Sequence, residues 1–175
     1  MWPVYITVGN IKKATRQKSS ENTVILLGYL PVTKLNKFSA SQRSAIQYQL
    51  FHNCMRVLLE PLIKAGTDGI KILCSNGKIQ LVFPILSAYL ADHPEQCLIA
   101  CVKENRCPKC LVHRLHSGDS ISSELHDVTE TLNILQAASL KLDDKDKFDK
   151  HSLQPVDPFW KNLPHCDIVR TTPPN

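Results

Sequence analysis

The first ninety residues carry two kinds of hydrophobic pattern. β-Branched and aromatic residues gather at 4–8, and a continuous apolar run follows at 23–30, so both segments are predicted to be strands and the second to be buried. From Ser41, apolar residues then recur every three or four positions as far as Gly66. This spacing predicts a long amphipathic helix that is bent near Pro61.

A hairpin is predicted directly after this helix. The segments 70–74 and 78–83 flank Asn76-Gly77, and an Asn-Gly pair between two apolar runs is the strongest short-range signal for a tight β-turn. Residues 85–91 are again mostly apolar. Periodicity alone leaves open whether they form a buried strand or a short helix.

The second half of the chain is less regular. Apolar positions at helical spacing predict a second helix from about residue 121 to 142. The stretch 141–150 alternates charges without an apolar face, so it is predicted to be solvated. In the Pro-rich tail 155–175, Phe159 and Trp160 are predicted to anchor the chain on the core, with nucleobase stacking as the alternative.

Composition narrows the class of protein. With 175 residues and 43% hydrophobic content, the chain can bury a core and is not intrinsically disordered. The net charge of +5 permits a polyanionic partner such as DNA without requiring one. The N-terminus has no secretory signal pattern and no apolar run reaches membrane-spanning length, so the expected location is intracellular and not in a membrane. In a reducing compartment, the seven cysteines are expected to be thiols or metal ligands.

Possible metal ligands are concentrated between residues 88 and 116. Cys107 and Cys110 have the C-x2-C spacing with which two thiolates occupy adjacent corners of one zinc tetrahedron. Cys101 and His113 are predicted to complete a structural Zn²⁺ site, with Cys97 and His116 as substitutes. Two alternatives stay open: inert buried thiols, or a redox-active cysteine pair.

Two further groups of residues have both a structural and a functional interpretation. Asp92 precedes Pro94 and Glu95, so it is either a helix N-cap or a carboxylate that binds a catalytic metal. The basic residues between 12 and 18 either contact phosphate or belong to a solvated loop. They are Lys12, Lys13, Arg16 and Lys18.

Several segments together resemble the central part of fungal Plavaka transposases, which belong to the Kyakuja-Dileera-Zisupton (KDZ) group of DNA transposons. The resemblance covers the chain to about Ile168. The segments are WPVYITVGNI at the start, VILLGYLPVTKL at 24–35, QLFHNCMRVLLEPL at 49–62, FPILSAYLADHPEQCLIACVKENRCPKC at 83–110 and DPFWKNLPHCDI at 157–168.

The resemblance implies an RNase H-like catalytic fold with an Asp-Asp-Glu (DDE) site and a cysteine-containing insertion after the second Asp. Asp92 matches that second acid, and Cys101, Cys107 and Cys110 match the insertion best. In the intact family enzyme, the acids would hold two Mg²⁺ ions about 3.5–4 Å apart for cleavage and strand transfer of DNA. The first Asp would precede Trp2 and the final Glu would follow Asn175, so the catalytic triad is expected to be incomplete.

These inferences define the expected fold class: α/β, an incomplete RNase H-like (DDE transposase) domain with a zinc-knuckle-like insertion. The order of strands, long helix and hairpin is compatible with that fold minus its first strand. The expected divisions are a partial core at 1–92, the Cys/His insertion at 93–118, a helical segment at 119–154 and the tail at 155–175.

Two functions are compatible with the sequence. One is a transposase fragment that acts on DNA by ancestry, is nuclear if functional, and is inactive alone. The alternative is a non-enzymatic, zinc-stabilised module that binds DNA or protein. The first function requires partner acids for Asp92. The second requires only the cysteine-containing insertion.

Overall fold

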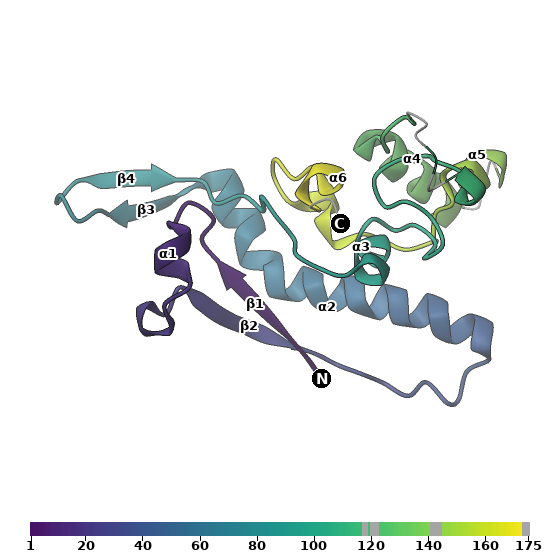
Figure 1. The fold of residues 1–175 in the computed structure, drawn as a ribbon, viewed down its shortest axis with the longest axis horizontal. Helices are drawn as coiled ribbons and strands as arrows, with labels where there is room; N and C mark the ends of the chain where they lie inside the picture. The colour runs from purple at the N-terminus through teal and green to yellow at the C-terminus, as the bar shows by residue number, and fades with distance from the viewer. Residues whose placement is uncertain (117–118, 120–122, 141–144, 173–175) are drawn as a thin grey trace.

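One long helix organises the molecule. The computed structural model describes residues 1–116, 119, 123–140 and 145–172. Helix α2 (Ala40–Asp68) runs through the middle, with a two-stranded sheet on one side and the C-terminal half of the chain on the other (Figure 1). The result is a mixed α/β fold with two small antiparallel sheets.

The first sheet confirms the two predicted strands. β1 (Trp2–Thr7) pairs antiparallel with β2 (Val24–Leu30), and a short helix α1 (Lys13–Arg16) and a 3₁₀ turn η1 (Ser19–Glu21) connect them. The prediction that β2 is buried was wrong for its first half, since Val24 and Ile25 are 52% and 61% exposed. The reason is that α2 covers only one face of this sheet, where Leu58 contacts Gly28.

Helix α2 is confirmed, with shifted ends. Ser39 is the N-cap, and its side chain and that of Gln42 form a reciprocal capping box, so the helix begins before the predicted Ser41. The helix continues through Pro61 and ends at Gly69, whose φ of 75° suits glycine. The predicted stop, Gly66, lies inside the helix instead.

The second sheet is the predicted hairpin. β3 (Ile70–Leu73) pairs antiparallel with β4 (Ile79–Val82), and the hairpin projects away from the rest of the molecule (Figure 1). Asn76 Oδ1 accepts the Lys78 N–H at 3.0 Å, and Gly77 adopts a φ of 74°. The Asn-Gly turn is therefore confirmed.

Residues 84–92 form neither the strand nor the helix that their apolar run allowed. They have no regular secondary structure, although the Tyr89 N–H donates to the Thr171 carbonyl oxygen at 3.0 Å. An apolar run needs a neighbouring strand to form a β-ladder, and within the described part of the chain none pairs with this segment.

The C-terminal half consists of short helices. The predicted second helix is confirmed as α4, which begins after Asp127; residues 121–122 and 141–142 of that prediction lie outside the described residues. In 141–150, the described part is helical; Asp149 and Lys150 are exposed, as expected for a solvated segment, whereas Phe148 packs against the core. The elements are α3 (His93–Ile99), η2 (Arg114–His116), α4 (Val128–Ser139), α5 (Lys145–His151), η3 (Phe159–Asn162) and α6 (Ile168–Thr171).

The hydrophobic core lies between α2 and this half of the chain. Phe159 and Trp160 are each 1% exposed, which confirms that they anchor the tail. The Trp160 indole N–H donates to the Ile99 carbonyl oxygen at 2.8 Å, so its polar atom is satisfied as well. Within the described residues, the structure has no helix long and apolar enough to cross a membrane.

Candidate functional site

Asp92 begins helix α3. Its Oδ1 accepts the Glu95 N–H at 3.0 Å, and Pro94 lies in the first turn, where a missing N–H costs nothing. The side chain of Asp92 is exposed. The structural interpretation of Asp92 as an N-cap is therefore confirmed, and its carboxylate is still open to solvent.

Glu95, the acidic residue nearest in sequence to Asp92, is hydrogen bonded to a tyrosine. The Tyr89 hydroxyl donates to Glu95 Oε1 at 2.9 Å, and burial raises the pKa of the Glu95 carboxyl. Burial and the adjacent Glu95 likewise raise the pKa of Tyr89. Among the described residues, no three acids, histidines or cysteines are grouped so that they could hold a metal ion. Asp92 therefore does not belong to a complete metal-binding site in this part of the chain.

Cys107 and Cys110 lie together in a tight turn. The Lys109 N–H donates to Cys107 Sγ at 3.4 Å, and the Cys107 and Cys110 thiols lie close enough to influence each other's ionisation. Burial raises the pKa of Cys110, whereas an N–H from Val112 acts in the opposite direction. A sulfur that accepts a backbone N–H, as Cys107 does, is suited to ligate a metal, so this pair could supply two of the four ligands of a tetrahedral zinc site.

The structure places Cys101 in a different environment. Cys101 is fully buried, its Sγ lies 3.7 Å from His52 Nε2 and 3.6 Å from the Ile99 carbonyl oxygen, and burial raises the pKa of its thiol. His113 is exposed, and its Nδ1 accepts the Leu115 N–H at 3.4 Å. Neither residue is grouped with Cys107 and Cys110 into a metal-binding set, although all four lie in the described part of the chain.

The two substitute ligands have partners of their own. Cys97 Sγ donates to the Arg106 carbonyl oxygen at 3.4 Å, and burial, with a smaller effect of the Cys107 thiol, raises the pKa of Cys97 to about 12. His116 Nδ1 lies 2.8 Å from Asp119 Oδ2. Both side chains are therefore already accommodated without a metal.

Sequence reasoning missed two histidines in this region: His126, which lies beside the cysteine pair, and His151, which lies beside His126. Residues 109–111 run antiparallel to 124–126, and this pairing brings His126 to the Cys107–Cys110 turn. The His126 ring lies 6.1 Å from that of His151 at the end of α5. The signal available in the sequence was weak because His126 and His151 lie far from the cysteines along the chain and match no known motif spacing.

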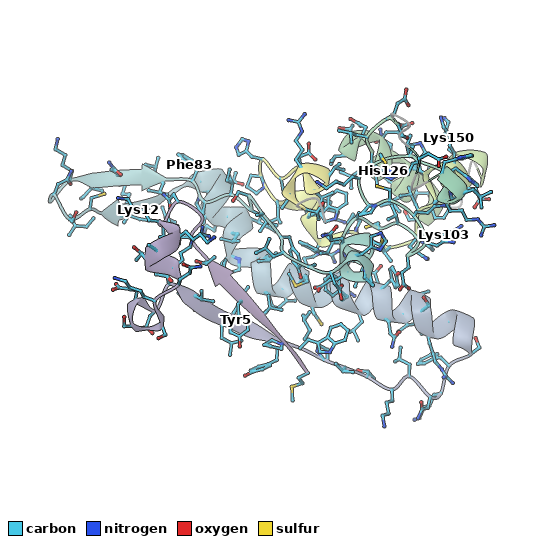
Figure 2. The ribbon with its side chains drawn as sticks, viewed as in Figure 1. Tyr5, Lys12, Phe83, Lys103, His126 and Lys150 are labelled. Atoms are coloured by element: carbon cyan, nitrogen blue, oxygen red, sulfur yellow. The ribbon has the colours of Figure 1, made fainter. Side chains whose placement is uncertain are left out.

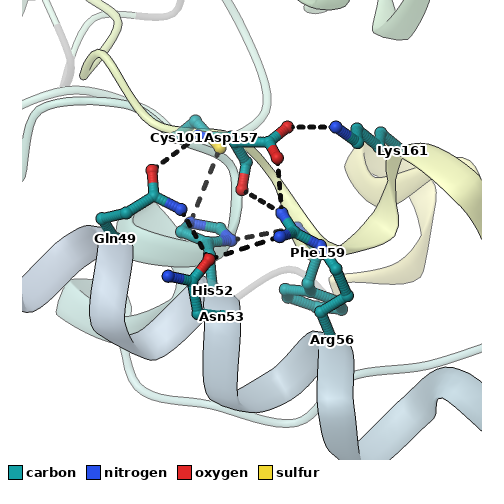
Figure 3. A network of polar contacts seen from close by, with 8 residues as sticks. All are labelled: Gln49, His52, Asn53, Arg56, Cys101, Asp157, Phe159 and Lys161. Atoms are coloured by element: carbon teal, nitrogen blue, oxygen red, sulfur yellow. Dashed lines mark hydrogen bonds and ion pairs between the residues drawn. The ribbon is translucent and has the colours of Figure 1, made fainter.

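A polar network joins α2 to the tail (Figure 3). His52 Nε2 lies 3.1 Å from the Leu98 carbonyl oxygen, and its Nδ1 accepts the Phe159 N–H at 3.3 Å. Arg56 Nη2 donates to both Asp157 Oδ2 and the Asp157 carbonyl oxygen, each at 2.8 Å. Burial, ahead of the nearby Arg56, lowers the pKa of His52 to about 4, so the ring is neutral at pH 7.

The four basic residues near the N-terminus differ in how far their side chains are buried. Lys12, Lys13 and Lys18 are exposed, and Lys12 lies close to the first sheet (Figure 2). Arg16 is half-buried, and its Nε is shielded from solvent. Only the three lysines are therefore presented fully to a polyanion.

The fold is a mixed α/β domain that carries an exposed acid at the start of a helix and, shortly after it, a close cysteine pair. A family model described as Plavaka transposase matches residues 1–175, so the chain belongs to the Plavaka transposase family and is transposase-derived. Comparisons with curated proteins and with solved structures gave no match.

Proposed function

We propose that this chain is part of a transposase catalytic domain whose ancestral reaction is DNA cleavage and strand transfer, and that it is inactive on its own. The observation that carries this proposal is the family match over residues 1–175. Asp92 supports it, because the carboxylate is exposed at the position that the resemblance assigns to the second catalytic acid. In this proposal the partner acids lie outside these 175 residues.

The chemistry explains the expected inactivity. Two-metal cleavage of a phosphodiester needs several carboxylates to hold both ions, one activating the attacking oxygen and one stabilising the leaving oxygen. Asp92 already accepts a hydrogen bond from the Glu95 N–H, and Glu95 is occupied by Tyr89. The described residues offer no third acid in this group.

The arrangement of elements supports an RNase H-like origin. β1 and β2 form an antiparallel pair, and α2 follows β2 and covers one face of it. In this proposal, a further strand would pair beside β1 and would let residues 84–92 join the sheet. That addition would place Asp92 at the end of a strand, next to the first acid.

A structural zinc ion is the second part of the proposal. Cys107 and Cys110 would hold it, and a bound zinc would contribute folding free energy to the segment that follows α3. The mutual contact of the two thiols and the backbone N–H groups that they accept support this role. The cysteine pair is also the observation that would favour a zinc-stabilised binding module if catalytic acids were never found.

The proposed partner is DNA and the proposed location is the nucleus. Exposed lysines at positions 12, 13 and 18, together with a net charge of +5, would support weak contact with phosphate groups. Because a charged loop reads no base edges, such contact would be independent of DNA sequence.

The in-frame DNA on both sides of the coding sequence tests the proposal. We expect an apolar strand ending in Asp before the codon for Trp2, and a Glu within a predicted helix after the codon for Asn175. Open reading frames that extend in both directions without these acids would contradict the catalytic proposal and would favour the binding module.

A further inference from the structure

We infer that a zinc ion at the Cys107–Cys110 turn would take its other two ligands from His126 and His151, and not from Cys101 and His113. This inference rests on the proposed zinc site and changes its ligand set to Cys₂His₂. It follows from where the structure places four side chains from three separate segments.

His126 is held against both cysteines by main-chain pairing. The His126 N–H donates to the Lys109 carbonyl oxygen and the Leu111 N–H to the Glu124 carbonyl oxygen, each at 2.9 Å. The isolated bridge between Cys110 and Leu125 belongs to the same pairing and places His126 next to the cysteine turn.

His151 packs against the His126 ring. The two ring centroids are 6.1 Å apart, and the rings are inclined at 53°. Two imidazoles that share one tetrahedral zinc with Zn–N bonds of about 2.0 Å have centroids about 5 Å apart. The observed separation is therefore close to that of a shared ion, and small side-chain rotations would close the difference.

Both histidines have an unsatisfied ring nitrogen. His126 and His151 are 8% and 3% exposed, and Nδ1 of each is buried without a hydrogen-bond partner. Leaving a buried polar atom unpaired costs about 1–3 kcal/mol, so two such atoms side by side call for a ligand. A metal ion accepts both lone pairs at once.

The other ring nitrogen of His151 has the kind of partner that metal-binding histidines usually have. His151 Nε2 lies 3.5 Å from Glu130 Oε1. Carboxylates and carbonyls in these positions fix the tautomer and the ring orientation of a ligating histidine. In contrast, Cys101 is fully buried against His52, and His113 is exposed.

Without the ion, no three of the described side chains lie close enough together to form a metal-binding group. Zinc binding would therefore have to draw the four ligands together. The ion would pull the start of α4 and the end of α5 towards the cysteine turn. Zinc should therefore stabilise helices that a cysteine-only site would leave unaffected.

Zn²⁺ and Co²⁺ titrations of the full chain, purified under reducing conditions, test this ligand set. Wild-type protein should bind about one equivalent, and Co²⁺ should give thiolate charge-transfer absorption. His126→Gln and His151→Gln should each weaken zinc affinity at least about tenfold and alter the Co²⁺ ligand-field bands. Cys107→Ser should abolish the charge-transfer absorption of its thiolate and most of the affinity.

Cys101→Ala, Cys97→Ser and His113→Gln are the matched controls, and each should keep wild-type affinity. Circular dichroism identifies any variant that fails to fold. Because His113 is exposed, the His113→Gln control is informative even if Cys101→Ala is unstable. Zinc lost in His113→Gln but kept in His126→Gln and His151→Gln would overturn this ligand set. Absence of zinc binding in the wild type would instead contradict the zinc proposal as a whole and leave the orphaned nitrogens to bound water.

Discussion

The Phe159 N–H donates a hydrogen bond to Nδ1 of His52, a residue 107 positions earlier in the chain. Nε2 of the same imidazole lies 3.1 Å from the Leu98 carbonyl oxygen. One buried side chain thus connects three segments: α2, the end of α3 and the tail. The neutral ring matches this arrangement, since one nitrogen donates and the other accepts.

His52 should make stability depend on pH. Its pKa falls from 6.5 to about 4 on folding, so the unfolded chain binds the proton more tightly. The stability from neutral His52 is fully present above pH 6.5 and is lost as the pH falls from 6.5 towards 4. The loss should be on the order of 3 kcal/mol.

Denaturant unfolding of wild type and His52→Gln at several pH values between 4 and 7 measures this effect. The difference between the two proteins should shrink as the pH falls. His165→Asn is the control, because His165 is exposed and its φ of 57° is tolerated by Asn. A difference that stays constant across this pH range would show that His52 does not titrate as described.

Gly66 should be intolerant of a methyl group. A Cβ there would lie 2.5 Å from Pro164 Cγ and 2.8 Å from the Pro84 carbonyl oxygen, although alanine is otherwise the better helix former. Gly66→Ala should therefore lower the free energy of unfolding by about 1–3 kcal/mol. Gly9→Ala, where the nearest atom is Ser87 Oγ at 3.6 Å, should change it by less than about 0.5 kcal/mol.

Thermal unfolding of the two glycine variants gives the comparison. An increase in melting temperature for Gly66→Ala would mean that helix propensity dominates and that the tail does not pack against this turn of α2. Similar values for Gly66→Ala and Gly9→Ala would lead to the same conclusion.

Local patterns predicted the elements of the first half well. The β1 and β2 strands, the long helix and the Asn76-Gly77 hairpin each depend on residues close in sequence, and all four are present. Residues 84–92 could not be assigned because their conformation depends on which strand lies beside them. Burial of β2 was mispredicted for a related reason: a continuous apolar run does not reveal that only one face is covered.

The candidate site was harder to predict than the fold. The Cys107–Cys110 turn followed from a spacing of two intervening residues, and the structure does bring these thiols together. Cys101 is close in sequence but has a φ of 61°, and its side chain points to His52. His126 reaches the cysteine turn through long-range main-chain pairing, and His151 reaches His126 through tertiary packing, neither of which a short motif encodes.

Two substitutions of Asp92 should separate its role as a helix cap from the effect of its negative charge. Asn caps helices as well as Asp does, whereas Ala does not, so Asp92→Ala should cost about 0.5–2 kcal/mol and Asp92→Asn only a few tenths. Chemical denaturation measures both. Equal destabilisation by the two substitutions would show that the negative charge, and not the hydrogen bond to the Glu95 N–H, supports α3.

DNA binding should be weak and steeply dependent on salt. Each lysine that contacts a phosphate adds about 0.9 to the slope of log affinity against log salt, so replacing Lys12, Lys13 and Lys18 with Gln should lower the slope by up to about 3. Fluorescence anisotropy with an arbitrary duplex gives the slope.

A control with the same change in charge isolates the effect of position. Replacing the exposed residues Lys34, Lys37 and Lys64 with Gln should leave the slope nearly unchanged. Tight, sequence-selective binding that survives the substitutions at 12, 13 and 18 would place the DNA contact elsewhere, most simply on the cysteine-containing segment.

Cleavage of supercoiled plasmid tests the central claim, which is that Asp92 lacks its partner acids in this chain. The purified protein, incubated with Mg²⁺ or Mn²⁺, should give no nicked or linear product above a no-protein control, and Asp92→Asn should behave identically. Metal-dependent nicking by the wild type that disappears in Asp92→Asn would contradict the account, because it would mean that a complete acid site forms within these 175 residues.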